Sequence, residues 1–196
     1  MNRYVISELT RLGFKVYRVA ILAWNKPSIN LARKLGFEEV ARWVSLETKI
    51  ESLLDAKECE CREISNPDTI WDKVSNSEMF RIAQGLIPIR WQWIRLNKRI
   101  LAELMRNNRI RAIICRENLT ALIPPNGEHY LPVGFINAEK FEDLQILASY
   151  LEKEKNTRPN TTIGFVFPKN YPFLSVLAQK DIFEIDETLV MELNTQ

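Results

Sequence analysis

Apolar positions near the start of the chain follow a helical spacing and then a strand spacing. Val5, Leu9 and Leu12 recur at i, i+4 and i+7, which predicts a helix with one apolar face that ends at Gly13. Residues 15–24 are apolar on both alternating faces, a pattern typical of a strand in a sheet that is covered on both sides. The pattern therefore predicts a short helix followed by a buried strand.

A second helix and a second strand are expected directly afterwards. Asn25 is a favourable N-cap residue, and Pro27 is tolerated in a first helical turn. The predicted helix ends at Gly36, and residues 39–46 predict another strand.

The middle of the chain predicts a connector, a strand and a mainly helical stretch. Residues 50–56 form the connector, and residues 59–64 a strand. Ser65-Asn66-Pro67-Asp68 is a strong helix start, so residues 65–108 are expected to be mainly helical, with breaks at Gly85 and Pro88.

The last third repeats the order of elements seen in the first fifty residues. Each part predicts a helix, a buried strand, an Asn-x-Pro sequence, a short helix, Phe-Glu and a strand. Asn25-Lys26-Pro27 thus corresponds to Asn170-Tyr171-Pro172. The remaining elements are expected as strands at 110–115, 119–123, 130–136, 161–167 and 183–193, with a helix capped by Asn137. The shared order predicts an internal duplication.

Residues 25–37, Asn-Lys-Pro-Ser-Ile-Asn-Leu-Ala-Arg-Lys-Leu-Gly-Phe, resemble the C-terminal motif of the GNAT superfamily of acetyl-CoA-dependent N-acetyltransferases. That motif reads Asn-x-x-(Ala/Ser)-x-x-Leu-(Tyr)-x-Lys-x-Gly-Phe. The resemblance implies an α/β fold of mixed sheets flanked by helices. It also implies an acetyl-CoA site that includes Trp24, Asn25, Ser28 and Lys34. Ala32 stands where many members carry a tyrosine that protonates the leaving thiolate, and alanine has no proton to give.

The resemblance implies two copies of the domain, of which the first is incomplete. Residues 1–50 would be the C-terminal half of one GNAT domain, 51–57 a connector, and 58–196 a degenerate GNAT-like domain. Family members bind the diphosphate of CoA with the backbone N–H groups of a glycine-rich loop. Glycine is needed there because a side chain would keep the diphosphate away from these N–H groups. The chain has six glycines, no two of them within six residues. In the second copy the equivalent segment, 135–141, has no glycine and is expected to place Glu139 in the first helical turn.

The implied function is transfer of an acetyl group from acetyl-CoA to an amine, with half of the site present in this chain. The acceptor and the catalytic residues stay open. The other half could be upstream in a longer parent chain or on another subunit, and without it the protein would not be catalytic. An uncovered edge of the first half-sheet would favour aggregation, so the second copy or a second subunit is expected to cover it.

Charge and tryptophans suggest an alternative, a nucleic-acid-binding module. Residues 81–116 carry nine Lys or Arg and one Glu, although the whole chain has a net charge of only +2. Trp91 and Trp93 lie in this segment, where bases could stack on them. Packing of both tryptophans in the core, with the arginines solvated or docked on the acidic C-terminal region, is the favoured explanation of the pattern. A third reading is a scaffold with two acetyltransferase-like lobes and no turnover.

Cysteine usage and hydropathy limit the protein class. The cysteines are Cys59, Cys61 and Cys115, an odd number without a secretion signal, which argues against disulfides. Cys59 and Cys61 are expected to be alternate residues of a strand. A metal site is not expected, because the one histidine, His129, follows a turn sequence. No apolar run reaches the ~18 residues of a membrane span, so the expected location is the cytoplasm.

Overall fold

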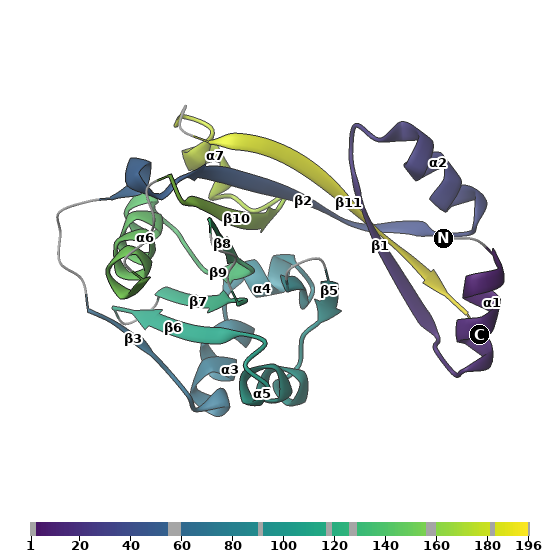
Figure 1. The fold of residues 1–196 in the computed structure, drawn as a ribbon, viewed down its shortest axis with the longest axis horizontal. Coiled ribbons are helices and arrows are strands. Elements are labelled where there is room, and N and C mark those ends of the chain that lie inside the picture. The colour runs from purple at the N-terminus through teal and green to yellow at the C-terminus, as the bar shows by residue number, and fades with distance from the viewer. Residues whose placement is uncertain are drawn as a thin grey trace. The chain divides into compact units, whose positions relative to one another are not determined.

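A computed structural model describes residues 3–54, 60–89, 92–116, 119–125, 129–155, 160–180 and 183–195. The chain divides into two compact units (Figure 1). Unit 1 comprises Met1–Val44 together with Asp186–Gln196, and unit 2 comprises Ser45–Ile185. Strands β2 (Glu38–Lys49) and β11 (Glu184–Asn194) each have residues in both units. Unit 1 is therefore built from the two ends of the sequence.

Unit 1 contains α1 (Arg3–Arg11), β1 (Val16–Leu22) and α2 (Lys26–Lys34), together with parts of β2 and β11. Its strand order is β1-β11-β2, with β1 antiparallel to β11. Apolar residues from both helices and from alternate strand positions share one core cluster. Its buried members are Tyr17, Ile29, Ala32, Phe37, Leu189 and Met191.

The helices and strands predicted for the first fifty residues are present, but β1 is not covered on both sides as expected, because Tyr17 is its one buried residue and Val16 and Ala20 are exposed. Asn25 caps α2, because its side-chain oxygen accepts the N–H of Ser28 at 3.2 Å. Gly36 follows the helix with φ of +90°, a left-handed conformation that glycine adopts without strain. The strand expected at 39–46 is β2, which continues to Lys49. The local pattern was sufficient here because caps and helix ends depend on neighbouring residues.

Unit 2 contains two groups of strands. Antiparallel strands β3 (Cys61–Glu63), β6 (Arg111–Cys115), β7 (Leu119–Ile123) and β9 (Phe135–Ile136) follow the order β3-β6-β7-β9. The second group has the order β2-β10-β8, in which β10 (Thr162–Pro168) runs parallel to β8 (Tyr130–Val133).

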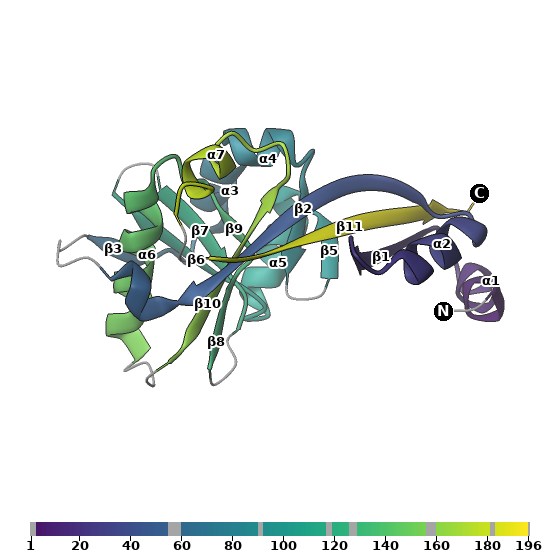
Figure 2. The same cartoon turned by 90° about the horizontal axis from the view of Figure 1, so that it is seen from above.

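Helices complete unit 2 and bury its sheets. They are α3 (Pro67–Ser75), α4 (Glu78–Ile82), α5 (Lys98–Arg106), α6 (Phe141–Lys155), α7 (Leu174–Leu177) and the short 3₁₀ helix η1 (Ile50–Leu53). Helix α6 is the longest of them and follows β9 directly in the chain (Figure 2). After β9 the chain passes through α6 and then forms β10, the strand that pairs with β8 in parallel.

The mainly helical stretch expected at 65–108 is wrong in its middle. Strands β4 (Leu86–Ile89) and β5 (Gln92–Arg95) form an antiparallel hairpin between α4 and α5. Every residue of β4 is buried, so both its faces are covered. Such a short apolar run has no period that distinguishes a strand from a buried helix.

The expectation of unpaired cysteines is also wrong, because Cys61 and Cys115 form a disulfide. The two residues are directly opposite in the antiparallel pair of β3 and β6. The bond closes a loop with a sequence separation of 54, which stabilises the fold by about 4 kcal/mol in the loop-entropy model. An odd cysteine count could not reveal a pairing that depends on strand register. Cys59 lies outside the described residues.

The boundaries of the two compact units differ from those predicted for the two domains. Residues 186–196 belong to unit 1, because β11 pairs with β1. Residues 45–50 belong to unit 2. The division into an incomplete copy at 1–50, a connector at 51–57 and a degenerate copy at 58–196 stays a prediction.

Candidate functional site

The chain contains two junctions in which a strand leads into a helix and then into a long strand. The first has the order β1, α2, β2 and begins in unit 1, and the second has the order β10, α7, β11 and begins in unit 2. The Asn-x-Pro sequence lies between strand and helix in both junctions. These two places are the candidate sites, since the residues implied by the family motif lie at the first of them.

The junction of unit 1 brings together three of the four predicted cofactor-binding residues. Trp24 lies in the turn after β1 with 67% of its surface exposed. Asn25 and Ser28 follow, both half-buried, and are joined by the capping hydrogen bond. Lys34 is exposed at the far end of α2, about 9 Å along the helix axis from Ser28 at 1.5 Å per residue. Trp24, Asn25 and Ser28 are therefore neighbours, and Lys34 is apart from them.

The backbone N–H groups at the start of α2 are already engaged. The N–H of Lys26 donates to Trp24, and the N–H of Ile29 donates to the backbone carbonyl of Asn25. Ser28 donates to the side chain of Asn25, and Pro27 has no N–H. This helix end has the positive side of the dipole but cannot offer these amides to an anion. The exposed Trp24 ring and the Ser28 hydroxyl are the groups that remain for a ligand.

In unit 2, two parallel strands separate close to the corresponding junction. Strand β8 pairs with β10 as far as Val133 and Phe165. After Gly134 the chain continues as β9, which pairs with β7 instead. A Cβ atom at Gly134 would collide with the carbonyl oxygen of Pro88, so only glycine fits at this bend. The two parallel strands therefore diverge after Gly134.

Aromatic side chains occupy that part of unit 2. Tyr171 bridges the two diverging segments, since its hydroxyl donates to the carbonyl of Ala138 at 2.8 Å. Its ring stacks on Phe167 with 5.7 Å between centroids, and Phe173 contacts both rings edge-on. None of the three aromatic side chains is more than 4% exposed. Burial raises the pKa of the Tyr171 hydroxyl above its ordinary value.

The backbone amides ahead of α6 are also engaged, by a carboxylate of the same chain. Asp143 accepts the N–H of Glu139 at 2.8 Å and that of Lys140 at 2.9 Å. Helix α6 begins at Phe141, so the expectation that Glu139 lies in its first turn is wrong. Asn137 does not cap the helix through these amides, and its side chain accepts the N–H of Thr120. These two amides are therefore not available to an anion.

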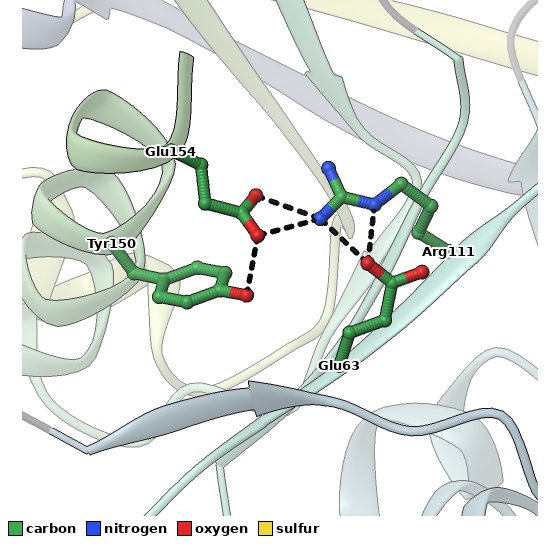
Figure 3. A network of polar contacts seen from close by, with 4 residues as sticks. All are labelled: Glu63, Arg111, Tyr150 and Glu154. Carbon is green, nitrogen blue, oxygen red and sulfur yellow. Dashed lines mark hydrogen bonds and ion pairs between the residues drawn. The ribbon is translucent and has the colours of Figure 1, made fainter. Parts of the chain in front are cut away.

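A four-residue polar network joins β3, β6 and α6 in unit 2 (Figure 3). Arg111 donates to Glu63 at 2.8 Å and to Glu154 at 2.7 Å, and Tyr150 donates to Glu154 at 2.6 Å. Burial disfavours the charge of Arg111, but its bonds to the two carboxylates outweigh this and raise its pKa. Burial and then the bond to Glu154 raise the pKa of Tyr150 to about 12. The network fastens three elements together, so its role is structural.

Four of the nine cations of the basic segment 81–116 pair with acidic side chains of unit 2. Acidic side chains pair with its cations, and backbone or amide oxygens accept from others. The pairs are Arg81–Glu78, Lys98–Asp68, Arg99–Glu103, Arg111–Glu63, Arg95 with the carbonyl of Gln84, and Arg109 with Gln92. Arg90 and Trp91 lie outside the described residues. These pairings do not favour the nucleic-acid hypothesis.

Neither a metal site nor a membrane-spanning helix is present in the described residues. Across 3–54 and the later described ranges, no three His, Cys, Asp or Glu side chains gather as a metal site. His129 is exposed, and its carbonyl accepts the N–H of Thr162. Among the helices of the described part, none is long and apolar enough to cross a membrane.

Sequence comparisons give no relative. No protein-family model matches the chain. No curated protein sequence matches it either.

Comparisons of structure do identify similar folds. A GCN5-related N-acetyltransferase from Kribbella flavida matches 98% of this chain and 46% of its own, at 14% identity and a TM-score of 0.57. A putative acetyltransferase from Pyrococcus horikoshii matches 98% and 59%, at 18% identity and a TM-score of 0.56. A tandem GNAT protein from the clavulanic acid biosynthesis pathway matches 95% and 66%, at 15% identity and a TM-score of 0.58.

These matches show that the chain has the fold of the GCN5-related N-acetyltransferases, as the residue motif predicted. The mixed α/β class is confirmed with it. The chain spans about half the length of the Kribbella flavida protein and of a probable N-acyltransferase from Enterococcus faecalis.

Proposed function

We propose that the chain takes part in N-acetyl transfer from acetyl-CoA to an amine, with the acyl carrier bound at the β1–α2 junction of unit 1. The observation that carries the proposal is the contrast between the two junctions. The middle residue of the Asn-x-Pro sequence is the exposed Lys26 at the first, next to Trp24, which is 67% exposed, whereas it is Tyr171, 4% exposed, at the second. The GNAT fold supplies the class of carrier. Unit 2 then has a structural or substrate-shaping role.

The residues of this junction suit the pantetheine arm of the carrier and not its diphosphate. Trp24 offers a flat apolar surface, and Ser28 offers a hydroxyl close to it. A diphosphate needs several unengaged N–H groups, and those of Lys26, Ser28 and Ile29 are already engaged. Residues outside the described part of the chain would have to bind the phosphates.

Acetyl-CoA supplies an activated thioester when bound. In the transfer, a nitrogen–carbon bond to the amine forms, the carbon–sulfur bond breaks, and the amine loses a proton while the thiolate gains one. Ala32 is 6% exposed and carries no acid, so the proton for the thiolate does not come from this position. The chain's own contribution would be positioning, which can account for a large part of such rate enhancements.

The first test compares two ligands by ligand-observed NMR. Acetyl-pantetheine is expected to bind with an affinity within about threefold of that of acetyl-CoA, because the site holds the arm and not the phosphates. Free thiol release in the presence of an amine panel would then report transfer. Absence of binding by both ligands would overturn the proposal and favour a scaffold without turnover.

A matched pair of variants locates the site. Asn25→Asp preserves the cap of α2 but replaces the side-chain amide, which can donate a hydrogen bond to the pantetheine arm, with a carboxylate that cannot. The expected effect is about fivefold weaker binding of both acetyl-pantetheine and acetyl-CoA, since a lost hydrogen bond costs about 1 kcal/mol. Asn66→Asp makes the same change at the cap of α3 in unit 2, where Asn66 accepts the N–H of Asp68. Equal effects of the two variants would show that the carrier does not bind at Asn25.

A further inference from the structure

The disulfide of unit 2 joins two strands that differ in burial. Strands β7 and β9 are buried throughout, and so are four of the five residues of β6. In β3, by contrast, Cys61 is half-buried, and Arg62 and Glu63 are exposed. Among the described residues β3 pairs with β6 alone, since the sheet order is β3-β6-β7-β9. Strand β3 therefore lies at the edge of a buried sheet and contributes no buried side chain to it.

Non-covalent contacts between β3 and β6 are expected to be weak. The strand pairing extends over three residues, and beyond it the N–H of Arg116 donates to the carbonyl of Glu60 at 3.1 Å. Glu63 forms an ion pair with Arg111, but its side chain is 48% exposed, and ion pairs at exposed positions add little stability. Segments with few buried contacts are also the first to open by local unfolding. The disulfide is therefore expected to be the main bond that keeps β3 in place.

The backbone hydrogen bonds of β6 alternate between its two neighbours. The N–H of Ile64 donates to the carbonyl of Ala112 at 2.9 Å, so the even-numbered positions of β6 bond to β3. The odd-numbered positions face β7 instead. The N–H of Ile114 consequently points to β3, whereas the N–H of its neighbour Ile113 points to β7. These two amides report separately on the two sides of the same strand.

We propose that the Cys61–Cys115 disulfide is a redox switch: reduction by a dithiol lets β3 separate from β6 while the rest of unit 2 stays folded. A thiolate of the dithiol attacks Cys61, which is half-buried, and Cys115, which is 1% exposed, leaves as a thiolate and takes up a proton. The second thiol of the reductant then displaces and protonates Cys61 and becomes part of a disulfide within the reductant. Separation of β3 gives β6 an unpaired edge to which another strand can add. The inference does not depend on the proposed activity.

Amide hydrogen exchange measured by NMR tests the separation of β3. The Cys59→Ser protein is used, because Cys61 and Cys115 are then its only cysteines. Reduction by dithiothreitol is expected to raise the ratio of the exchange rates of Ile114 and Ile113 by about tenfold or more. A general loss of stability would accelerate both amides and leave their ratio unchanged, and an unchanged ratio would overturn the inference. Two free thiols in the air-oxidised protein, counted after denaturation, would also overturn it.

Two variants show whether the disulfide or the ion pair keeps β3 in place. Cys61→Ser in the same background should give the raised ratio with or without reductant. Glu63→Gln removes the ion pair with Arg111 and keeps the disulfide, so the oxidised variant should stay within about twofold of the parent ratio. If Glu63→Gln raised the ratio as much as reduction does, the ion pair would be the main bond and the inference would be wrong.

Discussion

The two Asn-x-Pro junctions share a sequence pattern and differ in the residue at the middle position. In unit 1 that residue is Lys26, which is exposed, and in unit 2 it is Tyr171, which is buried. Tyr171 reaches across to Ala138 and joins two diverging segments. The residue at this position is therefore exposed in one junction and part of the buried core in the other.

Truncation of Tyr171, whose ring is buried at the second junction, is expected to have the largest effect on stability. Tyr171→Ala should lower the free energy of unfolding by about 4 kcal/mol, because it leaves a cavity among buried rings and an unpaired carbonyl. Tyr171→Phe keeps the ring and should cost about 1 kcal/mol for the lost hydrogen bond. Urea denaturation measures both.

Lys26→Ala is the matched control for these variants, since it changes the same position of the other junction. It should leave the unfolding midpoint unchanged, because Lys26 is exposed. If Lys26→Ala and Tyr171→Ala lowered the free energy of unfolding by comparable amounts, the two junctions would not differ in how this residue packs.

A smaller effect is expected at the groups that engage backbone amides in each unit. Asn25→Ala and Asp143→Ala should each destabilise the protein by about 1 kcal/mol, the usual cost of losing such a bond to a helix start. Asp143→Ala releases two amides, of Glu139 and Lys140, whereas Asn25→Ala releases one, of Ser28. We therefore expect inorganic phosphate to raise the Tm of Asp143→Ala and not that of Asn25→Ala.

The smallest effect concerns alkaline pH and unit 2. The pKa of Tyr150 is raised to about 12 in the folded protein, against ~10 for an unperturbed tyrosine. The folded state therefore holds this proton more tightly, and the corresponding stability is present below pH ~10 and is lost as the pH rises through the folded pKa. Tyr150→Phe should flatten the decline of Tm in this window. An unchanged slope would show that Tyr150 is not coupled to Glu154.

Sequence patterns predicted the elements of unit 1 because the determining contacts are local. The cap at Asn25, the end at Gly36 and the amphipathic face of α1 each depend on residues within one or two turns. The motif at 25–37 then indicated the fold, and the structural matches bear this out. The positions of Trp24, Asn25 and Ser28 as ligand-binding residues stay a prediction.

The features that sequence patterns missed depend on contacts between distant residues. The Cys61–Cys115 disulfide requires the register of β3 on β6, 54 residues apart. Asp143 was not recognised as the partner of amides ahead of α6, although an acidic residue in a first helical turn is a known signal. Tyr171 gave no signal at all, because an aromatic residue before proline is as compatible with a surface turn as with a filled core.

The assembly of unit 1 from both ends of the chain has a consequence for biosynthesis. A ribosome makes residues 45–185 before residues 186–196, which contribute β11 to unit 1. At ~5–20 residues per second, the N-terminal segment waits roughly ten seconds or longer for the strand that separates β1 from β2. The first residues synthesised are therefore among the last to reach their native contacts.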